Sequence, residues 1–352
     1  MGARSQRARP VAAVVSVVVI AGSLVAGVVA AERLGAPAGV PQVVSLAPRD
    51  TASIDVTDWS ALRERLDAGD DLVEVAGSRD LATRSTLVSS GEVVTDGLGW
   101  SPGTVRWEAL LQTTAGAALL VGLPGSDAQT RERLRAVGYV PDGDLWTIEL
   151  PDLRVGGVST PETFLHVKIL PGGVAVASSE ASLVDRVGDV AAGRDSSLAR
   201  DPAAARTWAQ AARLDAYSLQ SGRAGCASTD PAESGPDIAA QARVAVEAAG
   251  VLEPYQWLLR GLGPGETGAQ GGAGDRFEVA MAYDSGPGAA AQAQVRARLA
   301  TGPFIGQTGA VEESIVLTRN GADGAVAVLE FERQRGSASL MSFIGPLVLA
   351  SC

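Results

Sequence analysis

The chain has 352 residues, of which 46% are hydrophobic, and it carries a formal net charge of −11 at pH 7. This length and apolar content allow a packed core and exclude an intrinsically disordered protein. One histidine and two cysteines leave few side chains that bind a transition metal, and the excess of acidic residues disfavours nucleic acid as a partner.

The N-terminus has the pattern of a membrane anchor. Three arginines among residues 1–10 precede an uncharged run over residues 11–31. A helix of that length spans about 32 Å, the thickness of the hydrocarbon layer, and the arginines place the N-terminus in the cytoplasm. We predict a cytoplasmic N-terminus (1–10), a transmembrane signal-anchor that contacts the membrane (11–31), a linker (32–42) and an extracellular C-terminal domain. A signal peptide cleaved near Ala31 is the alternative.

The two cysteines, Cys226 and Cys352, both follow the apolar run and therefore lie on the predicted extracellular side. An even pair in an oxidising compartment predicts a disulfide. Closing a loop of about 126 residues would stabilise the fold by about 4 to 5 kcal/mol. Two free thiols are the alternative.

Beyond the linker, strand, hairpin and helix patterns recur. A strand over Ala52–Val56 precedes a helix that is capped by Thr57 or Asp58 and stopped by Gly69. A hairpin follows, with its turn at Thr114–Gly116.

The next helix opens at Ser126 and ends at Gly138. A strand within residues 144–150 and a second hairpin with its turn at Pro171–Gly173 come next. The helix after that hairpin places four apolar side chains on one face: Leu183, Val184, Val187 and Val190.

A composition shift at Asp201 and Pro202, which suit the start of a new helix, marks a module boundary. The pattern then repeats with a helix over Ile238–Ala249 and, after a glycine-rich loop, a strand over Phe277–Tyr283 and a helix over Ala289–Leu299. Asn320 and Gly321 predict the turn of a last hairpin. The apolar tail reads as a buried terminal strand that carries Cys352.

These elements predict an α+β fold. We expect two similar modules of hairpin-rich antiparallel sheet with packed helices, residues 43–200 and 201–352, behind the N-terminal transmembrane helix. The halves cannot be aligned residue by residue from the sequence.

Three phrases carry a resemblance to a known group: SLAPRDTASIDVTDWSALRERL, LHVKILPGGVAVASSEASLVDRV and SSLARDPAAARTW. Over residues 43–214 the chain resembles exported, single-anchor actinobacterial proteins of the DUF3352 type. That group has no assigned activity, so the resemblance implies an α+β ectodomain and no site residues.

Candidate catalytic residues are few. A serine hydrolase needs a base, for which His166 is the only histidine, but no serine stands in a G-x-S-x-G motif. Its strand also places His166 beside Lys168 on the less buried face. We therefore expect a structural or solvent-facing His166.

Carboxylate pairs offer a second route to catalysis, by glycoside hydrolysis. Glu312 with Glu313 and Glu330 with Glu332 are the candidate pairs, but the latter also suits the solvated side of a hairpin. No D-x-D-x-D-G calcium loop is present.

The glycine-rich stretch over residues 261–274 lacks the lysine of a phosphate-binding loop, which favours a flexible connector and no cofactor. The six tryptophans suit core packing, with Trp100 as the alternative ligand contact.

Three classes of function remain. We expect a non-enzymatic protein that binds an envelope protein or small ligand, or an envelope-assembly module. An envelope-acting hydrolase that uses carboxylates is the alternative. If the protein binds a ligand, we expect the ligand to occupy a cleft between the two halves.

Overall fold

The structure is a computed structural model that describes residues 43–149, 154–155, 158–159, 162–267, 273–334, 339–342 and 347–352. The predicted cytoplasmic N-terminus, transmembrane segment and linker lie outside these residues. No helix within the described ranges is long and apolar enough to cross a membrane.

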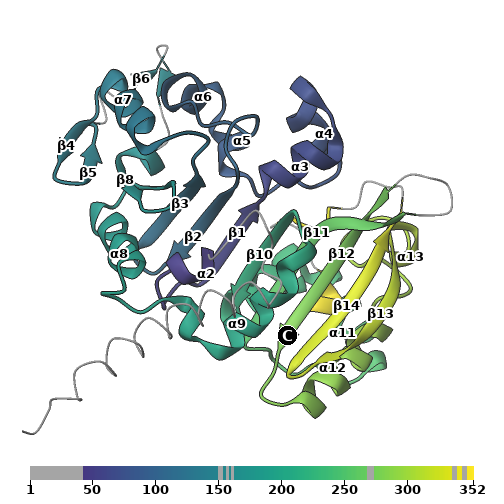
Figure 1. Cartoon of the computed structure of the whole chain (residues 1–352). Coiled ribbons are helices and arrows are strands. Elements are labelled where there is room, and N and C mark those ends of the chain that lie inside the picture. The colour runs from purple at the N-terminus through teal and green to yellow at the C-terminus, as the bar shows by residue number, and fades with distance from the viewer. Residues whose placement is uncertain are drawn as a thin grey trace, which may run out of the picture.

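The fold is α+β, with helices packed on an antiparallel sheet, as the sequence predicts (Figure 1). In the described part of the chain, 12 strands form one sheet in the order β13-β14-β12-β11-β10-β1-β2-β3-β9-β8-β5-β4. Their bounds are β1 (Ser53–Thr57), β2 (Glu108–Thr113), β3 (Gly116–Gly122), β4 (Val140–Asp142), β5 (Leu145–Thr147), β8 (His166–Leu170), β9 (Val174–Ser178), β10 (Ala216–Ser221), β11 (Trp257–Thr267), β12 (Ala273–Ala282), β13 (Ile315–Asp323) and β14 (Val326–Arg333). A separate small hairpin joins β6 (Arg154–Val155) to β7 (Val158–Ser159).

The two halves of the sheet share the order of their five central strands. From the centre outward, the first half runs β1-β2-β3-β9-β8 and continues with β5 and β4, whereas the second half runs β10-β11-β12-β14-β13. The halves meet where β1 pairs antiparallel with β10, with Asp55 opposite Ser218. Three residues further along each strand, Asp58 and Ser221 both cap the next helix. The structure therefore aligns the halves residue by residue at their centre.

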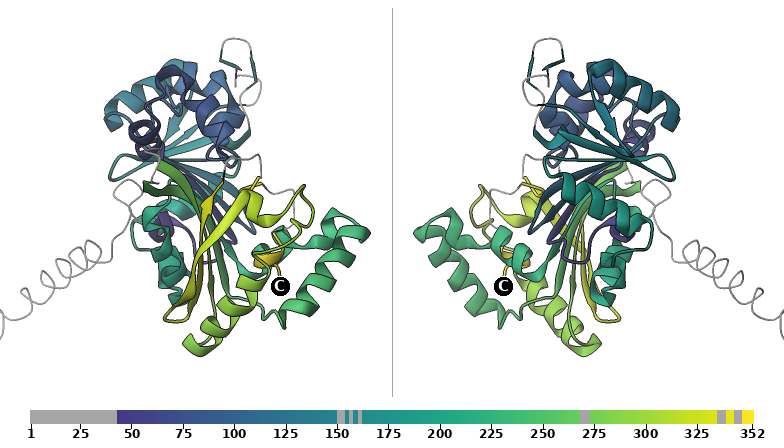
Figure 2. Two further views of the ribbon diagram at one scale, coloured as in Figure 1. Left: turned by 90° about the vertical axis from the view of Figure 1, so that its right-hand side faces the viewer. Right: turned by 90° about the vertical axis from the view of Figure 1, so that its left-hand side faces the viewer.

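Helices cover both faces of the sheet (Figure 2). We call the more heavily covered side the helix-rich face; it carries α3 (Trp59–Leu66), α4 (Leu72–Ser78), α5 (Thr86–Ser90), α6 (Glu92–Leu98), α7 (Asp127–Val137), α10 (Gly222–Thr229), α11 (Pro236–Ala249), α12 (Gly286–Arg298) and α13 (Val311–Ser314). The opposite face carries α2 (Val43–Leu46), α8 (Ala181–Ala191) and α9 (Pro202–Ala209). The core therefore consists of two apolar layers separated by the sheet.

Local sequence signals fix several boundaries where they were expected. The side chain of Asp58 accepts a hydrogen bond from the backbone N–H of Ala61, and Ser126 accepts one from that of Gln129. Asp201 caps α9, in which Pro202 is the first residue. Such caps satisfy N–H groups that have no partner inside the helix.

The first helix ends earlier than predicted. It stops at Leu66, because Asp67 takes a left-handed conformation with φ of 45°. Gly69 instead begins a short 3-10 helix.

The glycine-rich stretch is corrected by the structure, because most of its described residues are strand and not a flexible connector. Residues 261–264 of β11 pair with residues 275–278 of β12. A Cβ atom at Gly261 would collide with Tyr217, and one at Gly263 would collide with the backbone of Arg213. The glycines therefore allow neighbouring chain segments to approach closely.

Two further predictions near the C-terminus are wrong. Asn320 and Gly321 lie within β13, and the turn falls at Gly324, whose φ is 56°. In the described part of the tail, Val348–Ala350 form the 3-10 helix η7 and not a strand, because side chains rather than a neighbouring strand bind the carbonyl groups of Leu349 and Ala350.

Candidate functional site

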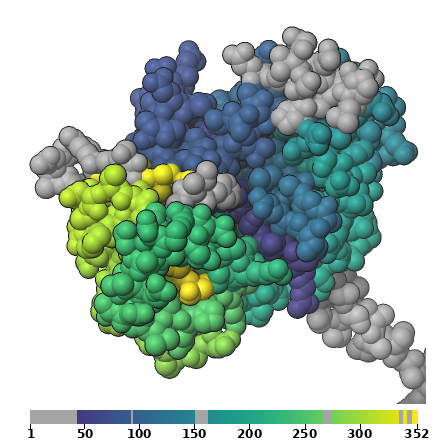
Figure 3. Space-filling view, turned by 180° about the vertical axis from the view of Figure 1, so that it is seen from behind, coloured from purple at the N-terminus to yellow at the C-terminus, as the bar shows by residue number. Residues whose placement is uncertain are grey.

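The C-terminal segment lies in the region between the two halves, where the sequence predicts a ligand cleft. In Figure 3 yellow C-terminal residues are visible between the blue first half and the green second half. Asp80 accepts hydrogen bonds from the backbone N–H groups of Leu340 and Met341 at 2.6 and 2.8 Å, and Arg84 donates to the carbonyl of Met341 at 2.6 Å. Residues 340–341 are thus bound to the first half.

The end of the chain is bound to the second half. Arg296 donates to the carbonyl oxygens of Leu349 and Ser351 at 2.9 and 2.8 Å, and the hydroxyl of Tyr255 donates to that of Ala350 at 2.9 Å. The last residue, Cys352, forms a disulfide with Cys226 of α10, with 5.4 Å between the Cα atoms. The described parts of the C-terminal segment, residues 339–342 and 347–352, therefore contact both halves.

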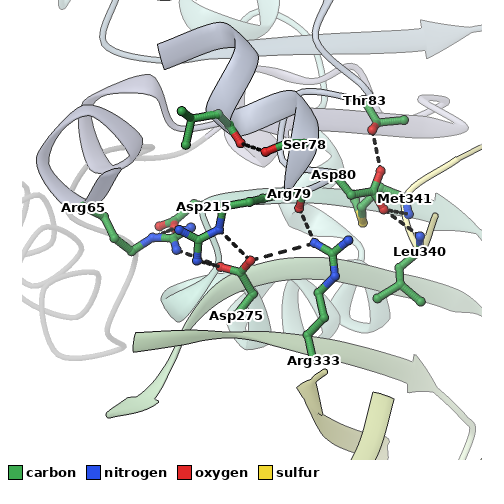
Figure 4. Close-up of polar contacts among 11 residues, drawn as sticks. Arg65, Ser78, Arg79, Asp80, Thr83, Asp215, Asp275, Arg333, Leu340 and Met341 are labelled. Atoms are coloured by element: carbon green, nitrogen blue, oxygen red, sulfur yellow. Dashed lines mark hydrogen bonds and ion pairs between the residues drawn. The ribbon is translucent and has the colours of Figure 1, made fainter. Parts of the chain in front are cut away.

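A cluster of opposite charges also joins the two halves (Figure 4). Arg65 of the first half lies 2.6 Å from Asp215 and 2.8 Å from Asp275, both of the second half. Arg79 pairs with Asp275 at 2.6 Å, and Arg333 lies 3.8 Å from the same carboxylate. Burial raises the pKa of Asp215, and Arg65 opposes that shift. Because its charges are paired, we assign this cluster a structural role, which is to hold the two halves together.

A second polar group lies at the centre of the sheet. Asp55, Ser218 and Arg260 are cross-strand neighbours in one row on the helix-rich face. Arg260 is 1% exposed, and its Nε and Nη2 atoms have no hydrogen-bond partner. Burial, followed by the nearby charge of Arg84, lowers the pKa of Arg260 to about 9. Neither of the two cavities described below reaches this row.

The larger of the two described cavities lies within the second half, not between the halves. We call it the α11 pocket. It has a volume of about 650 Å³, and α11, the segment after α12 and the C-terminal segment form its walls. Its lining residues are Ala240, Gln241, Val244, Ala245, Ala248, Ala249, Arg298, Leu299, Thr301, Pro303, Phe304, Ile305, Val311, Leu347, Val348 and Leu349.

The α11 pocket is almost entirely apolar. Arg298 is the one ionisable side chain among its described lining residues, and Gln241 and Thr301 are the other polar ones. Arg298 is exposed and donates from Nε to the carbonyl of Ala249, at the end of α11, at 2.7 Å. A cavity of this size and lining suits a small apolar molecule better than it suits acid–base chemistry.

The smaller cavity, of about 190 Å³, lies in the first half between α6, α7 and the segment around Trp100. Trp100 is only 2% exposed, and the other five tryptophans are also buried, as core packing requires. Trp100 therefore packs in the core, and it also lines this smaller cavity.

The candidate catalytic residues are dispersed. His166 is half-buried and its Nδ1 lies 3.0 Å from the hydroxyl of Thr147. Lys168 is more buried than the strand pattern indicated, because its stem packs on Gly188 while its amine pairs with Asp144 and Asp185 at 3.0 Å.

The candidate carboxylates do not line the described cavities, although Glu312 follows Val311, which lines the α11 pocket. Glu312 accepts a hydrogen bond from the N–H of Gly302, and Glu330 pairs with Arg319 at 2.8 Å. Neither these residues nor Glu313, Glu332 and His166 line either described cavity. Among the residues that the structure describes, no three metal-binding side chains cluster.

Sequence reasoning missed the α11 pocket. The available signal was composition, because α11 presents mainly alanine where the helices of the first half present leucine and tryptophan. Small side chains on a helix fill little volume.

Comparison of the chain with protein-family models, curated proteins and solved structures returned no match. The resemblance of residues 43–214 to the actinobacterial group therefore stays a prediction.

Proposed function

We propose that the chain is a membrane-anchored, extracytoplasmic binding protein, and that the α11 pocket holds a small ligand with an alkyl chain. The observation that carries this proposal is the apolar cavity of about 650 Å³. Ligand sites have volumes of about 300 to 1,000 Å³ and are mostly apolar with few polar groups. The anchor follows from residues 11–31, and the disulfide suits an oxidising compartment outside the cytoplasm.

The halves, residues 43–200 and 201–352, are in this proposal two similar modules of which only the second carries the ligand. The shared strand order and the matched caps Asp58 and Ser221 support the similarity. The tail forms part of the pocket wall through Leu347, Val348 and Leu349.

The test uses the full chain in lipid nanodiscs with a photoreactive long-chain alcohol. Labelled peptides are mapped by mass spectrometry, so that binding in the pocket is separated from binding near residues 11–31. We expect labels on α11 and on residues 303–305. The variant Ala245→Trp should weaken this labelling strongly, because the indole would occupy the part of the cavity beside α11.

Ala239→Trp is the matched control, since Ala239 lies on the same helix but not in the pocket. Labels spread evenly over the chain, or equal labelling in the two variants, would reject the proposal. Protection of α11 that grows with protein concentration would reject it too, because a second copy would then cover the pocket.

A further inference from the structure

We infer that the α11 pocket selects an amphiphile with one alkyl chain and an anionic head group, and that Arg298 binds that head group. This inference rests on the proposed function and adds the chemical class of the ligand. Its starting point is a contrast in charge. The chain has 40 acidic against 29 basic residues, yet the one charged residue in the described lining is a cation.

Arg298 has unused hydrogen-bonding capacity. Among the described residues it donates one side-chain hydrogen bond, from Nε to Ala249, and forms no ion pair. Its guanidinium carries further N–H groups on the two Nη atoms. The planar arrangement of these groups matches a carboxylate or phosphate.

Another arginine of the same helix shows what a purely structural role looks like. Arg296 is 0% exposed, and all three of its nitrogens donate hydrogen bonds, to Tyr283, Leu349, Ser351 and Glu253. Arg298 instead is exposed and lies beside a wall of apolar side chains. Arg296 therefore binds the tail, whereas the Nη groups of Arg298 remain available to a ligand.

The arrangement of polar and apolar groups sets the ligand's shape. The alkyl chain lies against Phe304, Ile305 and Leu349, and the head lies at Arg298 with Gln241 and Thr301 as further polar neighbours. A neutral alcohol fills the same apolar space but leaves the guanidinium in water. The acid therefore binds more tightly than the alcohol of equal length.

The experiment compares a photoreactive fatty acid with the photoreactive alcohol of the same chain, on the full chain in nanodiscs at pH 8. The half-saturating concentration is read from labelled pocket peptides. Arg298→Gln should raise that concentration about tenfold or more for the acid and leave the alcohol within about twofold. Arg298→Lys should keep a preference for the acid, because the positive charge remains.

Arg243→Gln is the control, because Arg243 is exposed on α11 but does not line the pocket. If Arg298→Gln weakens acid and alcohol equally, Arg298 acts only through its bond to α11 and the inference is wrong. If the acid is unaffected, the inference is also wrong, while the proposed function stands as long as the alcohol labels the pocket. Absence of pocket labelling by both probes rejects the proposed function itself.

Discussion

The two halves of the sheet share the order of five strands, but the helices that cover them differ in the size of their buried side chains. In the first half, α3 begins with Trp59 after the capping residue Asp58, and the side chains of Trp59 and Leu62 are both fully buried. At the matched positions of α10 stand Gly222 and Gly225. The cover of the first half is built from large side chains, whereas that of the second is built from small ones.

The glycines of α10 are needed for close packing. A Cβ atom at Gly222 would collide with the carbonyl of Tyr255, and one at Gly225 would press on the ring of Tyr255. Further along, α11 buries only Ala242 and Ala249. Strand order therefore does not decide how large a cavity each half contains. Side-chain volume on the covering helices decides it.

The largest change in stability should come from removal of the disulfide, which binds the tail to α10 of the second half. Replacing Cys226 and Cys352 by serine opens a loop of 126 residues and should cost about 5 kcal/mol of unfolding free energy. The thermal midpoint should fall by several degrees under non-reducing conditions. Pocket labelling should weaken as well, because Leu347–Leu349 form part of the wall. An unchanged midpoint would contradict a stabilising role for the disulfide.

The first half should respond most to loss of a large side chain. Trp59→Ala removes a fully buried ring and the hydrogen bond from its Nε1 to Glu108 at 2.8 Å. We expect a loss of about 4 kcal/mol, measured by denaturant unfolding. Val140→Ala, at a position 67% exposed, is the control and should change stability little. A loss below about 1 kcal/mol would show that the first half is not densely packed.

Each half contains a buried glutamate whose pKa is raised by burial. Glu108 of the first half accepts four hydrogen bonds, from Trp59, Ser85, Thr86 and Leu87. Burial raises its pKa, and these donors oppose the shift. Glu278 of the second half has Arg276 at 3.2 Å, and burial raises its pKa to about 7.

Because the pKa of Glu278 is higher in the folded chain, its contribution to stability is present below about pH 4.5 and is lost as pH rises through about 7. Glu278→Gln should remove this dependence, worth at most about 3 kcal/mol, from unfolding curves measured between those pH values. The control is Glu332→Gln, at an exposed position. Identical pH slopes in wild type and Glu278→Gln would contradict the raised pKa.

The smallest effect should come from filling the cavity. Ala245→Leu adds apolar volume to the α11 pocket and should stabilise the chain by about 1 kcal/mol. Ala239→Leu on the same helix tests the effect of the substitution outside the pocket. A gain for Ala245→Leu that matches the control in denaturant unfolding would mean that the cavity was not filled.

Short-range signals in the sequence account for much of the local structure and for the class of fold. The caps Asp58, Ser126 and Asp201, and the turns at Thr114–Gly116 and Pro171–Gly173, act within a few residues. Such signals depend on backbone geometry close in sequence, so they are readable in one chain. Pairing of the two cysteines also followed, because no other thiol is available.

Long-range contacts set how the halves meet and where the larger cavity lies. The pairing of β1 with β10 joins residues more than 150 positions apart, and Gly261 lies opposite Tyr217 in the neighbouring strand, where a Cβ atom would collide. The tail stays off the sheet because Arg296 and Tyr255 bind its carbonyl groups. The α11 pocket exists because alanines meet a distant loop and the chain end. Contacts between remote segments set these features, and no local pattern encodes them.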